Sequence, residues 1–185
     1  MTEVEIIESI QSGNTKAFSI LVERYQEMVF RTAIGFIHNK EDAEDLTQEI
    51  FVKVYQSLGS FMGKSEFSTW IYRITVNTAL NCVRRKKIER FFDFSDEQLQ
   101  PVLHQQESAD NPEQTMINDE SDKLISNAID KLSQKQKTAF VLSRYEELSQ
   151  KEIAAIMQTT EGAVEQHLQR AKVNLQKRLT SIVGK

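Results

Sequence analysis

The chain has 185 residues, of which 27% are charged, with only two prolines, six glycines and a formal net charge of −4. This length allows one or two small domains, each with a buried core, and the composition favours a soluble, mostly helical protein. No apolar run approaches the roughly 18 residues of a membrane span, and the N-terminal MTEVEIIESI lacks the basic start and apolar centre of a signal peptide, so we expect a cytoplasmic protein.

Few residues suggest catalysis or metal binding. The single cysteine, Cys82, excludes an internal disulfide; we expect it to pack in a core, and a redox role is the alternative. His38, His104 and His167 are isolated, without metal-ligand spacing, and there is no glycine-rich phosphate loop. We therefore expect no enzymatic activity, no cofactor, no metal site and no small-molecule substrate.

Two helices are predicted at the start of the chain. The first spans roughly residues 2–11 and is ended by Gly13. The second opens at Asn14 or Thr15 and runs to about His38. Both have apolar residues at helical spacing: Ile6, Ile7 and Ile10 in the first, and Phe18, Leu21, Val22, Tyr25, Val29, Ala33 and Phe36 in the second. We assign these residues to a core.

A third helix is predicted to begin after Asn39, whose side chain can cap it. Its first turns, KEDAEDLTQE, are rich in carboxylates, which the helix dipole favours. Capping alone would explain some of them, but Asp42, Asp45 and Glu49 recur at i, i+3 and i+7. They would form a carboxylate ridge beside Gln48, suited to an arginine-rich partner.

Residues 67–87, FSTWIYRITVNTALNCVRRKK, are the most informative stretch. A cap from Ser68 or Thr69 can start a helix here, with a buried stripe of Phe67, Trp70, Ile71, Ile74, Val76, Leu80 and Val83. The other side would be a solvent-facing ridge of polar and basic groups: Tyr72, Arg73, Asn77, Asn81, Arg84, Arg85, Lys86 and Lys87. Such a ridge fits a nucleic-acid backbone; a solvated basic face is the alternative.

The loop before this helix, residues 59–66, combines two glycines with Phe61 and Lys64. An aromatic wall with polar neighbours could hold an unstacked base. A plain connector is the alternative.

A change of composition follows Arg90. Residues 91–120 lose helical periodicity, gain Gln, Ser, Asp and Pro, and contain acidic residues without any lysine or arginine. This pattern predicts a flexible acidic linker.

Helical periodicity returns near residue 121. The pairs Ser133 with Gln136 and Ser149 with Glu152 have capping-box spacing and predict two helix starts. The second opens a short helix, QKEIAAIM, which is followed by a tight break and a longer helix with a basic outer face. This is the helix-turn-helix arrangement, whose second helix enters the major groove of DNA; simple helical packing is the alternative.

Together these segments resemble the sigma-70 family of bacterial RNA polymerase sigma factors, in its small extracytoplasmic-function (ECF) class. DAEDLTQEIF (42–51) resembles a segment of the second region, residues 67–87 resemble its promoter-recognition helix, and residues 129–179 resemble the fourth region. The resemblance implies an all-α protein of two small helical domains. They would be a region 2 helical bundle (1–90) and a region 4 helix-turn-helix domain (121–185), joined by the flexible acidic linker (91–120).

The resemblance also implies partners and contacts. The protein would bind the largest-subunit coiled coil and the flap of core RNA polymerase, direct it to promoter DNA and promote melting, controlled by an anti-sigma factor that provides its only, indirect link to a membrane. Contacts to the coiled coil would be Asp42, Glu44, Asp45, Gln48 and Glu49. Contacts to the −10 element, with Phe61, Lys64 and Ser65 around a flipped base, would be Phe61, Lys64, Ser65, Ser68, Arg73, Asn77, Asn81, Arg84, Arg85, Lys86 and Lys87. Contacts to the −35 element would be Glu161, Glu165, Gln166, Gln169, Arg170 and Lys172. Trp70 is assigned to the core, with stacking on the duplex edge as the alternative.

Two positions depart from the family's pattern. Glu165, Gln166 and His167 stand where a basic residue, a small hydroxyl and an arginine are usual, so both the −35 sequence and the affinity for it should differ. Glu165 would be repelled by a nearby phosphate, although an acid there can accept from cytosine N4. Asn81 replaces a common aspartate and could shift the −10 preference.

Three other functions are compatible with parts of the sequence. A ligand-responsive regulator would need a pocket in residues 1–90 and would bind duplex DNA without polymerase. A helical nuclease would need clustered metal ligands beyond the carboxylate ridge. An adaptor would bind polymerase but not promoter DNA.

Overall fold

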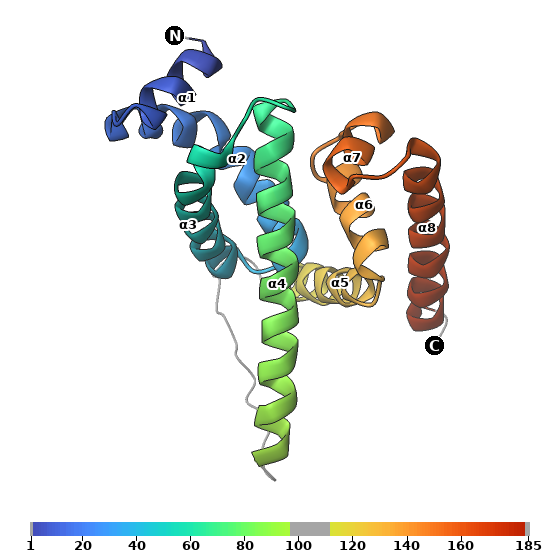
Figure 1. Ribbon diagram of the computed structural model, residues 1–185. Coiled ribbons are helices and arrows are strands. Elements are labelled where there is room, and N and C mark those ends of the chain that lie inside the picture. The colour runs from blue at the N-terminus through green and yellow to red at the C-terminus, as the bar shows by residue number, and fades with distance from the viewer. Residues whose placement is uncertain (1, 97–111, 184–185) are drawn as a thin grey trace.

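The computed structural model describes residues 2–96 and 112–183, and every regular element in these ranges is a helix. The all-α prediction is thus confirmed for this part of the chain; residues 97–111, in the predicted linker and including His104, lie outside it. The elements are α1 (Glu3–Gln11), the short 3-10 helix η1 (Thr15–Ala17), α2 (Phe18–Ile37), α3 (Lys40–Ser57), the 3-10 helix η2 (Leu58–Ser60), α4 (Phe67–Asp96), α5 (Pro112–Asp130), α6 (Gln134–Arg144), α7 (Gln150–Met157) and α8 (Glu161–Val183). Figure 1 shows α1 and α3 on one side of the long helix α4, α2 crossing behind it, and α6–α8 on the other side.

The N-terminal helices begin and end close to where the sequence predicts. Thr2 and Glu5 form a capping box at the start of α1, and Gly13 follows that helix with a left-handed φ of 108°. α2 ends at His38, which adopts the left-handed conformation that often terminates helices. Asn39 then caps α3 by accepting a hydrogen bond from the Asp42 backbone N–H (2.9 Å). Helices α2, α3 and α4 pack against one another around a buried apolar core.

Helix α4 differs from the prediction at both ends. It begins at Phe67, and the Trp70 N–H donates to the Glu66 carbonyl (3.2 Å), so Ser68 and Thr69 lie within the first turn. The predicted cap by either residue is therefore wrong. At its other end the helix continues to Asp96, because no glycine or proline interrupts this part of the sequence.

The C-terminal helices form the predicted helix-turn-helix. Ser149 and Glu152 make a complete capping box at α7, whereas Ser133 at α6 makes only half of one. The other half is missing because the Gln136 side-chain oxygen instead accepts from Asn174 of α8 (3.0 Å). α7 ends at Gln158 in the left-handed conformation, and α8 starts directly afterwards. Upstream, α5 begins with a proline inside the predicted linker, at a position where helices favour proline.

The two groups of helices pack directly against each other. α4 contacts α7, and α2 contacts α6, as Figure 1 shows. One continuous buried cluster joins residues such as Leu21 and Ile71 of the first group with Leu142 and Ile153 of the second. The described part of the chain is therefore docked into one body, and α4 is covered on two sides.

Candidate nucleic-acid and polymerase interfaces

The carboxylates predicted for polymerase binding lie on two sides of α3. Glu44, Asp45 and Gln48 are exposed to solvent. Asp42 and Glu49 are only half-exposed, because both lie toward the side of α3 that meets α4. The continuous ridge expected from the spacing is therefore divided, with Asp45 as its most accessible acidic member.

Both half-exposed carboxylates form ion pairs. Asp42 Oδ2 lies 2.5 Å from the Nζ of Lys86, which projects from α4. Glu49 Oε1 lies 2.7 Å from Lys53 Nζ, one turn further along α3. These charges are partly neutralised within the protein, so Asp45 is better placed than either to attract a basic partner.

An apolar groove lies between α2 and α3, next to Gln48. It encloses about 590 Å³ and is lined by Phe18, Val22, Gln26, Thr47, Gln48, Phe51, Val52, Tyr55 and Gln56. Val52 is 55% exposed and Tyr55 is 42% exposed. Sequence analysis did not assign these two residues, although their position outside the buried stripe of α3 was a signal that could have found them.

Four aromatic side chains surround the loop between η2 and α4. Phe61 packs edge-on to Phe67 (ring centroids 5.1 Å apart) and tilted against Trp70 (5.3 Å). Phe67 stacks on Trp70 at 5.4 Å, and Tyr25 of α2 meets the edge of Phe67. Only Phe67 is buried, so Phe61 and Trp70 keep part of their ring surface accessible beside the loop.

The loop itself is tied down at one end and open at its tip. Gln11 Nε2 donates to the Phe61 carbonyl (3.4 Å), while Gly63 turns the chain with a left-handed φ of 67°. Met62 is 72% exposed and Lys64 is exposed at the tip. The other residues predicted for this part of the −10 site are half-exposed: Ser65 and Ser68.

One face of α4 carries the predicted amides and cations. Arg73, Asn77, Asn81 and Arg84 follow one another at helical spacing, and Arg84 Nη2 lies 3.5 Å from Asn81 Oδ1. Asn77 and Asn81 are exposed, as is Arg84, whereas Arg73 is half-exposed and donates from Nη2 to the Ala155 carbonyl of α7 (2.7 Å). The structure thus brings these side chains together, with one end of the row in contact with the helix-turn-helix.

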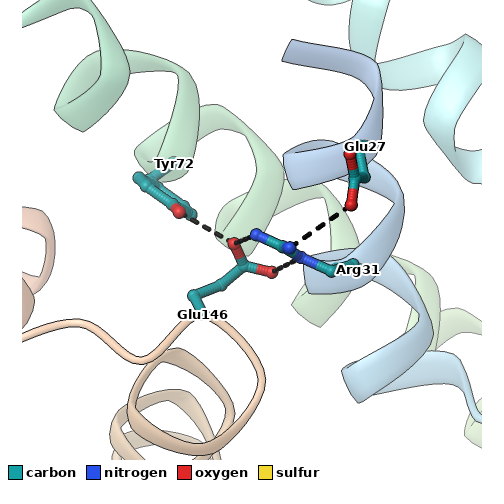
Figure 2. Close-up of polar contacts among 4 residues, drawn as sticks. All are labelled: Glu27, Arg31, Tyr72 and Glu146. Carbon is teal, nitrogen blue, oxygen red and sulfur yellow. Dashed lines mark hydrogen bonds and ion pairs between the residues drawn. The ribbon is translucent and has the colours of Figure 1, made fainter.

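Tyr72 does not belong to this ridge. Its side chain is buried, with 8% exposed, and its hydroxyl donates to Glu146 Oε2 (2.9 Å) in the turn after α6 (Figure 2). The prediction that it faces solvent is wrong because α4 is covered on a second side, which a single amphipathic stripe does not anticipate.

The basic end of α4 is not uniform. Arg85 Nε lies 3.8 Å from Glu89 Oε1, Lys86 pairs with Asp42, and Lys87 is exposed. The neighbouring Cys82 is buried, as expected for a cysteine that packs in a core. Charge for a phosphate is therefore most available at Lys87.

The residues predicted for the −35 element all lie on the outer face of α8, and all are exposed: Glu161, Glu165, Gln166, Gln169, Arg170 and Lys172. Gln169 Nε2 lies 3.4 Å from Glu165 Oε1, so the carboxylate is held one turn from the amide. His167 points to the other side, and partial burial, followed by the nearby Lys135 and Arg170, lowers its pKa. The Thr160 hydroxyl caps the helix by accepting from the Ala163 N–H (3.2 Å).

The part of the chain that the structure describes contains no group of His, Cys, Asp and Glu side chains that could hold a metal ion. Within the same residues, no helix is long and apolar enough to cross a membrane.

Comparison with known proteins agrees with this arrangement. The family model for sigma-70 region 2 matches residues 21–88, and that for sigma-70 region 4 matches residues 122–175. The ECF RNA polymerase sigma-E factor of Haemophilus influenzae is 34% identical over 99% of this chain and 98% of its own length. The chain belongs to the sigma-70 family. The RNA polymerase sigma-H factor of Pseudomonas aeruginosa is also similar, with 32% identity over 97% of this chain and 94% of that protein.

Solved structures show the same sigma-70 fold. CnrH, in a complex with the cytosolic domain of CnrY, has a TM-score of 0.65 and 22% identity, covering 95% of this chain and 96% of that one. The sigma factor RpoE of Bartonella quintana, in a complex with the anti-sigma factor NepR, has a TM-score of 0.60 and 22% identity, covering 89% and 98%. In this family member, region 2 corresponds to α2–α4 and region 4 to the helices from α5 to α8.

Proposed function

We propose that this chain is an ECF sigma factor that binds core RNA polymerase, directs it to −10 and −35 promoter elements and promotes DNA melting, under control of an anti-sigma factor. The observation that carries the proposal is the outer face of α4, where amides and cations continue from an aromatic loop on the same domain. The cations and amides of α4 suit backbone phosphates, and the aromatic loop suits unstacked bases, so binding of single-stranded DNA requires these two surfaces side by side. No covalent step is assigned to this chain, since the polymerase carries out RNA synthesis.

The polymerase-binding surface is the exposed side of α3 with the adjoining groove. We assign the groove to the coiled coil of the polymerase's largest subunit, with basic residues of that subunit over Asp45. The apolar groove would supply contact area and the exposed carboxylate would fix orientation, because charge complementarity contributes more to specificity than to affinity. Region 4 would additionally contact the flap.

The −10 surface combines Phe61, Lys64 and the row of residues on α4. Flipping a base costs a few kcal/mol, and stacking on an aromatic ring contributes about 1–3 kcal/mol per base. The two are of similar size, so the loop can hold a base that the polymerase has helped to unpair but cannot melt a promoter alone. The exposed outer face of α8 would then bind the −35 element in the major groove.

Control by an anti-sigma factor is supported by the structural neighbours, which were solved with the cytosolic domain of CnrY and with the anti-sigma factor NepR. Such a partner would also provide the only link of this chain to a membrane, and the chain would act in the cytoplasm, together with its polymerase.

Transcription initiation with core polymerase from the same source, on genomic fragments, tests the proposal. New start sites should appear with the protein and weaken about tenfold, equivalent to about 1.4 kcal/mol, with Asp45→Lys. Glu8→Lys, a matched charge reversal at an exposed position of α1, should leave them unchanged. Duplex binding without any new start would favour a regulator instead, and polymerase binding without a start would favour an adaptor.

A further inference from the structure

Helix α1 packs beside the turn that leads into the base-binding loop of residues 59–66. Ile6, Ile7 and Ile10 are buried in the core, and α1 contacts both α2 and η2. In Figure 1 it lies at the same end of the molecule as the start of α4. The match to the region 2 family model begins at residue 21, after this helix, and no residue assigned to polymerase or promoter DNA lies on it. Packing is the only role given to α1 so far.

Gln11, the last residue of α1, bonds to the backbone of this turn. Its side-chain Nε2 donates to the Leu58 carbonyl (2.9 Å) and to the Phe61 carbonyl (3.4 Å). The Phe61 N–H also donates to the Leu58 carbonyl (3.1 Å), which closes η2. One side-chain amide therefore holds both ends of the turn from which Phe61 projects.

These bonds fix the direction of the Phe61 ring. Phe61 has an extended backbone (φ −73°, ψ 113°) directly after the 3-10 turn. The rotamers open to a side chain depend on the backbone that carries it. With this backbone the ring lies 5.1 Å from Phe67 and 5.3 Å from Trp70, measured between centroids. A shift of the Phe61 carbonyl away from Gln11 would change the backbone and move the ring.

A second contact from α1 reaches the other side of the same aromatic group. The Tyr25 hydroxyl of α2 donates to Glu3 Oε1, at the start of α1. The Tyr25 ring meets the edge of Phe67, with centroids 5.7 Å apart, and Phe67 stacks on Trp70. Burial, followed by the hydrogen bond to Glu3, raises the pKa of the Tyr25 phenol, which therefore stays a donor at neutral pH. Helix α1 thus supports the aromatic group at two points.

The polar contact at Gln11 matters more for the loop than for the fold. Three buried isoleucines already anchor α1, and Gln11 is exposed, so its hydrogen bonds add only modestly to the stability of the domain. A ring that is already held in place loses less conformational freedom when it binds a base than a mobile ring does. The benefit of the Gln11 bonds therefore falls on base binding.

We propose that α1 is a brace for base recognition and that Gln11 is its positioning residue, holding the η2 turn so that Phe61 meets an unstacked base in a fixed orientation. The proposal rests on the base-binding role of the loop given above, and it adds a residue that itself touches no DNA. Because Gln11 acts through Phe61, loss of its donor should weaken base binding and leave the phosphate contacts of α4 intact.

The test uses the full chain without polymerase. Gln11→Met keeps the length and neutrality of the side chain but has no donor for the two carbonyls, whereas Gln11→Lys keeps a donor. Gln150→Met repeats the first change at an exposed glutamine of α7, and Glu8→Gln matches the charge change of the second at an exposed position of α1. Circular dichroism and thermal unfolding establish that each variant is folded.

The first measurement is the order of the loop without DNA. Acrylamide quenching of the fluorescence of Trp70, the single tryptophan, reports access to the ring beside Phe61. Quenching should be stronger in Gln11→Met than in the wild type, while Gln11→Lys lies closer to the wild type and both controls match it. Equal quenching of Gln11→Met and the wild type would overturn the brace.

The second measurement is affinity for a pool of random-sequence single-stranded oligonucleotides. Gln11→Met should bind about fivefold more weakly, the effect of losing an ordinary hydrogen bond. The slope of log affinity against log salt should not change, because the phosphate contacts remain. In a Phe61→Ala background, Gln11→Met should have no further effect. A lower slope, or a loss that adds to that of Phe61→Ala, would overturn the positioning role.

The brace and the proposed function can fail separately. Weaker binding by Phe61→Ala but not by Gln11→Met would overturn the positioning role and leave the base-binding loop in place. A wild type that binds no oligonucleotide, or that is matched by Phe61→Ala, would refute the base-binding loop and the positioning role together. The quenching result would still show whether Gln11 holds the turn.

Discussion

The Lys86 ammonium and the Asp42 carboxylate lie 2.5 Å apart across the contact of α4 with α3. One had been predicted to bind promoter DNA and the other to bind polymerase. Both side chains are partly exposed, at 31% and 45%, so the pair contributes little stability, on the order of 0–1 kcal/mol. Its effect is rather to reduce the charge that each residue offers to an external partner.

Lys87→Gln should therefore weaken single-stranded DNA binding more than Lys86→Gln. Each phosphate contact contributes about 0.7 to the slope of log affinity against log salt for single strands. We expect Lys87→Gln to lower the slope by about that amount and Lys86→Gln by less than half of it. Salt titrations of the two variants side by side provide the measurement, and equal losses would contradict the assignment.

Trp70 is the chain's single tryptophan and lies 5.3 Å from the Phe61 ring, so its fluorescence reports on the predicted base-binding loop. Addition of a single-stranded oligonucleotide should change the Trp70 emission of the wild-type protein, because a base stacked near Phe61 alters the surroundings of the Trp70 ring. Phe61→Ala should weaken oligonucleotide binding by about 1–3 kcal/mol. Leu148→Ala, which changes a half-exposed apolar residue far from the loop in sequence, serves as the comparison. An emission spectrum insensitive to DNA would place the bases elsewhere.

The buried Tyr72 phenol should make the stability of the docked arrangement depend on pH. Burial, followed by the adjacent Glu146 carboxylate, raises the pKa of the Tyr72 phenol above its ordinary value of 10.0. The folded protein, in which the two regions are docked, thus holds the phenolic proton more tightly than the unfolded chain. The stability that Tyr72 contributes is complete below pH 10 and is lost as the pH rises through the Tyr72 pKa of the folded protein.

Ultraviolet absorbance of tyrosinate across an alkaline titration checks this. The wild type minus Tyr72→Phe difference should show a tyrosine that ionises late, and Tyr72→Phe should lower the free energy of unfolding by about 1.5–3 kcal/mol, the range for a hydrogen bond to a charged group. A difference curve with an ordinary midpoint would argue against the buried contact.

Glu165 should set both the strength and the sequence of −35 recognition. Glu165→Gln removes a carboxylate from the exposed face of α8, so duplex affinity should rise several-fold through lost repulsion with phosphate. If Glu165 accepts from cytosine N4, the same change should relax the preference for cytosine, with about 1–3 kcal/mol of discrimination at stake. Selection of duplexes from a random library by holoenzyme containing the wild type or Glu165→Gln would reveal the change in preference. An unchanged consensus would show that Glu165 contacts no base.

Local signals predicted most helix boundaries correctly. Asn39 and Ser149 cap the helices that the sequence indicated, because a cap depends on a few neighbouring residues. Gly13 ends α1 and Cys82 is buried for equally local reasons of turn conformation and apolar spacing. The candidate site residues on the outer face of α8 are likewise exposed as expected.

The docking of the two regions could not be predicted from the sequence. Tyr72 was assigned to solvent because one amphipathic stripe predicts one buried side, whereas α4 has two. Glu146 and Lys137 carry no pattern that distinguishes them from surface charges, since the contacts that bury them include Arg31, 115 positions from Glu146, and Phe36, 101 positions from Lys137. Lys86 was assigned to DNA because the sequence places it in a basic run. Its pairing with Asp42 depends on how α3 and α4 cross, which the sequence pattern does not reveal.

The docked interface uses α6, α7 and the turn between them, and it leaves the outer face of α8 exposed. The two halves of a promoter are consequently unequal for the free protein. On this geometry an upstream duplex could meet α8 without any movement of the two regions, whereas Arg73 must first release the Ala155 carbonyl before its Nη2 can contact DNA.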